Sequence, residues 1–124
     1  LTQTEYLEAL SYSKRSSQGL LNQLLEGEQL DALVAPSNGP GWKIDLENGD
    51  NGSSVNYVSS ASLAAISGYP SITVPAGFIN DLPIGISFIG AAFSEPELIA
   101  IAYDYEQRSM ARRPPALRHI DPPH

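Results

Sequence analysis

Apolar positions recur at a helical period at both ends of the chain. Near the start, Thr2 and Glu5 match a capping box, and the apolar residues that follow return at steps of three and four. We predict a helix over residues 3–26, with a solvated polar middle and two packed ends. Near the other end, Ser94 and Glu97 match a second capping box, which predicts a helix over residues 95–110.

Three short apolar runs between these helices predict strands. Residues 30–35 form a run that stops at Pro36, which cannot donate to a strand ladder, so we predict a buried strand that ends there. Residues 71–74 and 84–89 are apolar almost throughout, which predicts two more strands with both faces covered. The Asn-Asp pair at 80–81 lies between them and favours a hairpin turn.

A long polar loop and a short helix separate the first strand from the hairpin. Residues 36–56 are rich in Gly, Asn, Ser and Asp, and a loop of this length often carries function. Residues 57–67 are rich in Ala and Ser and precede Gly68, which predicts a helix with a glycine C-cap.

Prolines exclude regular structure near the end of the chain, so we predict one domain over 1–113 and a Pro-rich tail over 114–124.

Composition narrows the choice of partners. The chain has 124 residues and a formal net charge of -7, without a Lys/Arg stripe, so we expect no nucleic acid partner. It contains no cysteine, which excludes thiol catalysis and cysteine-ligated metals. No apolar run reaches the roughly 18 residues of a membrane span, so we expect a soluble, cytoplasmic protein without a membrane partner. A helical pattern starts at once after Leu1, which we interpret as the start of a piece of a longer protein.

Two kinds of catalytic site are disfavoured by the residues present. His119 and His124 are the two histidines and lie in the Pro-rich tail, so we expect no Ser-His-Asp triad. Asp45, Glu47 and Asp50 come nearest to a metal site, but their spacing departs from the calcium-loop pattern, and a solvated loop explains them better. We therefore expect no metal and no cofactor.

Serine chemistry assisted by lysine needs a lysine of depressed pKa beside serines. The chain has two lysines. Lys14 lies on the polar side of the first predicted helix, and Lys43 lies in the polar loop. Because neither setting favours a neutral amine, we assign no catalytic residue.

Four motifs follow one another along the chain. They are LDALVAP at 30–36, GYPSITVPAGF at 68–78, LPIGISFIG at 82–90 and FSEPELIAIAYDYEQ at 93–107. This ordered set resembles the C-terminal segment of the amidase-signature hydrolases. The polar loop, GPGWKIDLENGDNGSS at 39–54, is similar to that of bacterial amidases related to peptide amidase. The resemblance covers nearly the whole chain up to about Arg113.

The resemblance implies a fold, a reaction and the part of the enzyme that this chain supplies. Family members are large α/β proteins with a mixed sheet between helices, and they cleave or transfer amides with a Ser, a second Ser in a cis peptide and a Lys. Those residues lie upstream of the matching segment, so the resemblance implies a chain without the catalytic triad that supplies sheet scaffold and part of the substrate-pocket wall. The implied substrate is a small amide or a peptide amide. The implied partner is the N-terminal part of an amidase, with self-association as the alternative.

The resemblance also places the polar loop at the border of the substrate entrance. Trp42 is the main candidate contact, because an aromatic residue on a polar loop either stacks on a ligand or packs back onto the protein. The candidates for hydrogen bonds at the rim are Asp50, Asn51, Ser53 and Ser54, although capping within the loop explains them equally well.

Two other interpretations stay open. The first is a stand-alone binding or assembly module derived from the same fold, which predicts a folded monomer. The second is a fragment of the glutamyl-tRNA amidotransferase A subunit, which needs partner subunits and an ammonia donor.

Overall fold

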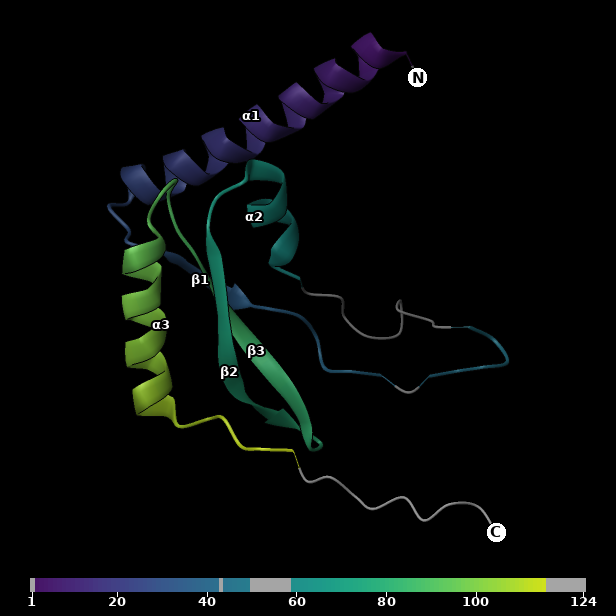
Figure 1. Ribbon diagram of the computed structural model, residues 1–124, viewed down its shortest axis with the longest axis vertical. Helices are drawn as coiled ribbons and strands as arrows, with labels where there is room; N and C mark the ends of the chain where they lie inside the picture. Colours follow the sequence, from purple (N-terminus) through teal and green to yellow (C-terminus); the bar gives the residue numbers. More distant parts are fainter. Residues whose placement is uncertain (1, 43, 50–58, 116–124) are drawn as a thin grey trace.

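The computed structural model describes residues 2–42, 44–49 and 59–115 (Figure 1). The elements in chain order are α1 (Gln3–Gly27), β1 (Leu33–Pro36), α2 (Ala61–Ser67), β2 (Ser71–Ile79), β3 (Leu82–Ile89) and α3 (Glu95–Ser109). The strands form one antiparallel sheet in the order β1-β3-β2. α3 packs against β2 and β3, while α1 packs against α2. The predicted α/β class is confirmed.

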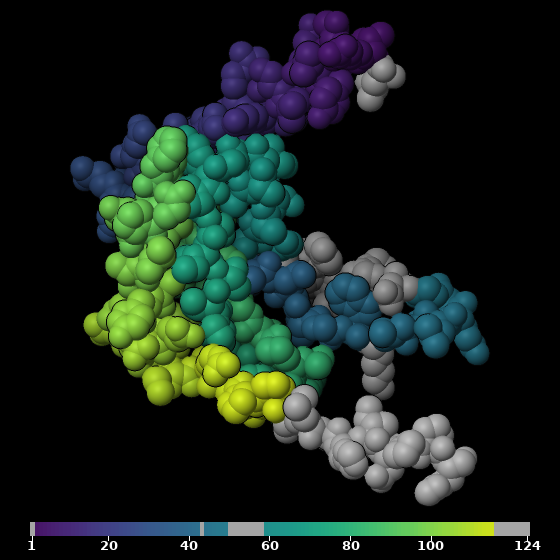
Figure 2. Space-filling model, in the orientation of Figure 1, coloured from purple at the N-terminus to yellow at the C-terminus, as the bar shows by residue number. Residues whose placement is uncertain are grey.

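The predicted cap of α1 is confirmed, but its packing differs from the prediction. Glu5 N–H donates to Thr2 Oγ1 at 3.2 Å, and Thr2 N–H donates to Glu5 Oε2 at 2.7 Å. Leu21 and Leu25 near the other end are buried. The prediction of two packed ends is wrong, because Tyr6, Leu7 and Leu10 are each more than half exposed, and this half of the helix stands clear of the rest (Figure 2).

The first half of α1 is exposed because α1 is much longer than the helix against which it packs. α1 has 25 residues, which extend over roughly 37 Å at 1.5 Å per residue. α2, against which it packs, has 7 residues and extends over about 10 Å. Among the described residues no segment reaches the first turns of α1.

β1 lies at an edge of the sheet, so the prediction of a buried strand is wrong. It pairs with β3 from Leu33↔Ile89 to Pro36↔Ile86, and Val34 is 58% exposed. Pro36 is the last residue of the strand, whereas the predicted strand ended at residue 35. A proline is tolerated there because an edge strand leaves part of its backbone N–H groups unpaired.

The predicted hairpin is confirmed and is longer than predicted. β2 and β3 are joined by Asn80 and Asp81, whose φ values are 50° and 65°. Two left-handed residues in a two-residue loop give a turn whose twist matches that of the strands. A register shift lies between Pro75 and Gly77, so the proline in β2 sits next to an irregularity of an edge strand.

The two faces of the sheet differ, which corrects the prediction that both are covered. On one face Val74 and Phe88 form a core with Leu98 and Ala102 of α3. On the other face Ile89 packs with Leu21 of α1 and Ala64 of α2, but only at one end of the sheet. Thr73, farther along this second face, is exposed.

The short helix α2 ends as predicted. Gly68 caps it with φ 75°, a left-handed conformation that glycine adopts freely. Two hydrogen bonds join α1 to the end of α2 and to the residues just after it: Gln18 Nε2 donates to Ser67 O at 2.9 Å, and Tyr69 Oη donates to Asn22 Oδ1 at 2.7 Å.

The second predicted capping box is wrong. Ser94 is the N-cap of α3, but its hydroxyl donates to Ala91 O at 2.8 Å and caps no helical N–H. Pro96 lies in the first turn as the sequence predicts, and the helix ends where Met110 turns left-handed at φ 45°. In the described residues no helix is both long and apolar enough to cross a membrane.

Candidate functional site

Three hydroxyl groups from three segments meet on the second face of the sheet. Ser37 directly follows β1, Thr73 belongs to β2 and Ser87 belongs to β3. Ser87 Oγ lies 2.7 Å from Ser37 Oγ and 2.8 Å from Thr73 Oγ1, and the third pair is 3.4 Å apart. Ser87 is buried, whereas Thr73 is exposed. We refer to Ser37, Thr73 and Ser87 as the hydroxyl cluster.

Gly85 gives the hydroxyl cluster its space. A Cβ at this position would lie 2.8 Å from Thr73 Cγ2 and 2.9 Å from Ser37 Oγ. Ser37 N–H also donates to Gly85 O at 3.0 Å, which extends the β1-β3 ladder by one bond. The absence of a side chain therefore allows both the backbone and the hydroxyl of Ser37 to reach β3.

The hydroxyl cluster was not predicted from the sequence, although the residue pattern marks the polar face on which it lies. Ser71 and Thr73 alternate with apolar residues along β2, and Ser87 stands between Ile86 and Phe88. Period-two alternation marks one polar face of a strand. The strands of the hairpin are therefore less uniformly apolar than the prediction of two covered faces assumed.

The polar loop leaves the sheet at Ser37 and passes the end of the hairpin. A Cβ on Gly41 would lie 3.9 Å from Leu82 Cδ1, which is ordinary contact distance. The next residue is Trp42, and it is 43% exposed. Its side chain is thus neither fully packed onto the protein nor fully free. Both interpretations of Trp42, stacking on a ligand and packing onto the protein, remain predictions.

Farther along the loop, Asp45 closes a tight turn. Its carboxylate accepts from the backbone N–H of Asn48 at 2.9 Å and of Glu47 at 3.0 Å, and also from Asn48 Nδ2 at 3.1 Å. These bonds, the backbone bond from Asn48 first among them, hold the pKa of Asp45 below its ordinary value. Gly49 follows with φ 79°, a conformation that favours glycine.

A local turn thus accounts for the carboxylate of Asp45. Within residues 2–42, 44–49 and 59–115, no three His, Cys, Asp or Glu side chains gather where they could hold a metal ion. The four predicted rim residues, Asp50, Asn51, Ser53 and Ser54, lie outside the described residues and stay predictions.

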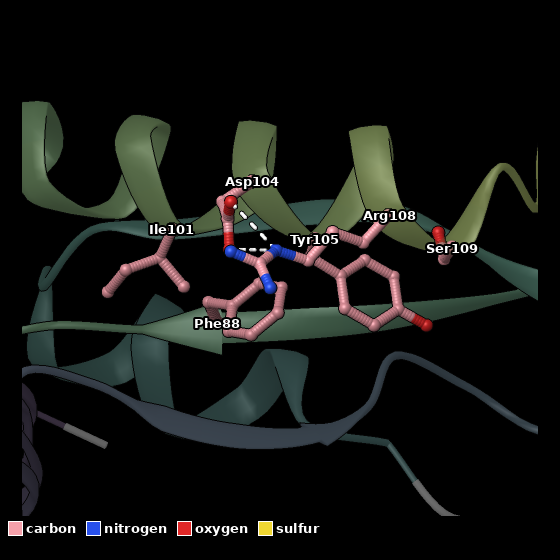
Figure 3. Close-up of a pocket in the computed structure, with 6 residues that line it drawn as sticks. All are labelled: Phe88, Ile101, Asp104, Tyr105, Arg108 and Ser109. Atoms are coloured by element: carbon pink, nitrogen blue, oxygen red, sulfur yellow. Dashed lines mark hydrogen bonds and ion pairs between the residues drawn. The ribbon is translucent and has the colours of Figure 1, made fainter.

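A shallow pocket lies between α3 and the sheet (Figure 3). It is lined by Phe88, Ile101, Asp104, Tyr105, Arg108 and Ser109. Phe88 and Tyr105 pack edge to face with ring centroids 5.7 Å apart. Arg108 Nε pairs with Asp104 Oδ2 at 2.9 Å, one helical turn away, and both side chains are mostly exposed. An exposed pair of this kind contributes at most about 1 kcal/mol, and most of the exposed lining of the pocket is apolar.

The end of the described chain returns to the hairpin turn. Arg113 donates to Asp81 Oδ1 at 2.8 Å, and its guanidinium carbon lies 3.7 Å from the centre of the Phe78 ring. The described residues after α3, 110–115, form no helix or strand, and Arg113 ties them to the end of β2.

The hydroxyl cluster can hold a segment in place, and among the described residues no base lies within hydrogen-bond distance of it. The bonds of Ser37, Thr73 and Ser87 run to one another, and in the described part of the chain none runs to an amine, an imidazole or a carboxylate. A serine nucleophile needs such a base. The same described residues contain no cis peptide bond.

Comparison with known proteins defines the class. The family model described as Amidase matches residues 1–99, and the chain belongs to the amidase family. The resemblance inferred from the four motifs is confirmed.

Individual relatives refine this result. The chain is 45% identical to the native peptide amidase from Stenotrophomonas maltophilia, with a TM-score of 0.76, over 90% of this chain and 21% of that protein. It is 39% identical to a probable amidase of Arabidopsis thaliana, over 86% of this chain and 17% of that protein. With the glutamyl-tRNA(Gln) amidotransferase A subunit from Thermotoga maritima the identity is 26% and the TM-score 0.63, over 86% of this chain and 23% of that protein. The chain thus spans about a fifth of the length of these relatives.

Proposed function

We propose that this chain forms part of the sheet and one wall of the substrate pocket of an amide hydrolase. The observation that carries the proposal is the 45% identity to peptide amidase over 90% of this chain, with only 21% of that enzyme covered. In this proposal the nucleophile and its lysine lie outside these 124 residues. The hydroxyl cluster supports it, since its three members bond to one another.

The proposed substrate is a peptide amide or another small acyl amide, with water as the acceptor. Identity supports this choice, because it is 45% with peptide amidase and between 26% and 35% with amidotransferase A subunits. Residues 1–113 form the amidase segment in this proposal, and residues 114–124 form a tail.

The partner is the remaining part of an amidase. Two surfaces of the described residues support this assignment. They are the apolar first half of α1, with Leu7 and Leu10 about half exposed, and the outer edge of β1, with Val34 58% exposed. Both are of the kind that a larger sheet and its helices would cover.

A chimera tests the proposal. The segment of Stenotrophomonas maltophilia peptide amidase that matches this chain is replaced by the chain itself, and hydrolysis of a peptide amide is measured. We expect a folded, active chimera, while the host lacking the segment is inactive. A folded chimera without activity would contradict the proposal, and so would turnover of amides by the isolated chain that is abolished by mutating one of its own residues.

The same chimera tests Trp42. Replacing Trp42 by Ala removes an aromatic contact worth about 0.5 to 1.5 kcal/mol, so we expect KM for a peptide amide to rise by about 2- to 12-fold with little change in kcat. Trp42→Phe keeps a ring and should retain most of the affinity. An unchanged KM in Trp42→Ala would assign the side chain to packing alone.

A further inference from the structure

We infer that Ser37 is a positioning residue that sets the path of residues 38–42 and thereby the place of Trp42. The structural part of this inference concerns this chain alone. Its consequence for substrate affinity rests on the proposed function.

Ser37 is attached to the hairpin through both its backbone and its side chain. Its N–H donates to Gly85 O at 3.0 Å, and its hydroxyl lies 2.7 Å from Ser87 Oγ and 3.4 Å from Thr73 Oγ1. Ser87 is only 4% exposed and is itself bonded to Thr73 at 2.8 Å. A side chain held by a buried partner has one orientation, so the direction in which the chain leaves β1 is defined at this residue.

Gly85 leaves the space in which Ser37 packs against β3, and the distances from a Cβ built at Gly85 show how closely Ser37 packs there. Besides the contact with the hydroxyl, a Cβ there would lie 3.3 Å from Ser37 Cβ. The serine thus fills the space that a side chain on β3 would take. A residue larger than serine or threonine at position 37 would lose this fit.

The distance from the attachment to Trp42 is short. Five residues follow Ser37 up to Trp42, and a chain of that length spans at most about 17 Å. It approaches β3 again at Gly41, where an added Cβ would lie 3.9 Å from Leu82 Cδ1. The indole therefore follows a short tether that is bonded at Ser37 and passes close to Leu82.

The end of the hairpin that the tether passes is also restrained. Leu82 follows the turn that contains Asp81, and Arg113 pairs with Asp81 at 2.8 Å while covering the Phe78 ring at 3.7 Å. Because this ion pair is exposed, it holds the turn only weakly. At Ser37, a single atom, the hydroxyl oxygen, bonds the tether to the buried Ser87.

The test uses the only tryptophan of the chain as the reporter. In the dilute 124-residue chain, Ser37→Ala should shift Trp42 emission to the red, increase its quenching by acrylamide and speed hydrogen exchange over residues 37–42. Ser37→Thr keeps the hydroxyl and should restore slow exchange and low quenching. Ser13→Ala, the same change on the exposed side of α1, should alter none of these signals.

The outcomes decide the inference in either direction. A folded Ser37→Ala variant with unchanged quenching and exchange would overturn it. Should Ser37→Ala fail to fold, Thr73→Val removes one hydroxyl of the cluster at nearly constant shape. It should then give a smaller change of the same sign, and an unchanged signal would overturn the inference.

A kinetic readout separates this inference from the proposed function. In the active chimera, Ser37→Ala should raise KM for a peptide amide while kcat stays close to that of the unmodified chimera. An inactive chimera bears on the proposed function alone, because fluorescence and exchange of the chain report the position of the loop without any activity.

Discussion

At the scale of single residues, two glycines of this chain differ in the space that is available for an added side chain. Gly85 faces Thr73 and Ser37, where a Cβ would meet atoms at 2.8 Å and 2.9 Å. Gly19 lies inside α1, and a Cβ there meets nothing within 4 Å. The same chemical change therefore has a steric cost at one position and none at the other.

We predict that Gly85→Ala destabilises the chain by about 1 to 3 kcal/mol, because the added methyl forces Ser37 and Thr73 apart. Gly19→Ala is the matched control and should stabilise it by about 1 kcal/mol, since alanine favours the helix. Urea unfolding followed by circular dichroism measures both. Equal shifts of the two midpoints would show that close packing at Gly85 is not what decides the effect.

At the scale of elements, α1 is a helix whose first half is held by its own cap. The reciprocal bonds of Thr2 and Glu5 satisfy N–H groups that no described neighbour reaches. The backbone bond from Thr2, followed by its hydroxyl, holds the pKa of Glu5 below its ordinary 4.5. The charge on one exposed side chain is thereby linked to helix content.

We predict that the first turns of α1 lose helicity as the pH falls through the lowered pKa of Glu5. The sign follows from the direction of the shift: stabilisation is complete above the unfolded value and is lost as the folded carboxylate is protonated. NMR titration of the Glu5 carboxyl measures the pKa. Thr2→Ala keeps the backbone N–H of residue 2 and removes the hydroxyl, so the pKa should return part of the way toward 4.5, and a value unmoved by this change would refute the contribution of the hydroxyl.

At the scale of the whole molecule, large apolar side chains are exposed on several elements, and two of these surfaces are of the kind that a partner covers. The first half of α1 presents Tyr6, Leu7 and Leu10, and β1 presents an edge with Val34 exposed. An exposed edge strand can pair with another chain. A stand-alone monomer, one of the interpretations left open by the sequence, would have to keep both surfaces in water.

We predict that the isolated chain self-associates in a concentration-dependent way, measured by size-exclusion chromatography with light scattering. The double variant Leu7→Glu with Leu10→Glu and the edge variant Val34→Lys should each shift the equilibrium toward monomer. Ser16→Glu, which adds a charge elsewhere on α1, should not. A monodisperse wild-type monomer at all concentrations would instead favour the stand-alone binding module.

Local signals explain which parts of the fold could be predicted. The turn at Asn80 and Asp81, the glycine cap at Gly68 and the cap at Thr2 each depend on residues close together in sequence, and each is confirmed. The burial of α1 and β1 depends on what lies beside them, which no local pattern contains. The hydroxyl cluster joins residues 36 and 50 positions apart, so only the register of three strands could reveal it.

The two-residue turn between β2 and β3 also has a consequence for the order of folding. Closing so short a loop costs little chain entropy, and hairpins form within microseconds. β1 must instead find β3 across a separation such as that between Val34 and Phe88. We expect the hairpin to form before β1 joins it, so that the polar loop takes its final course only in the last step.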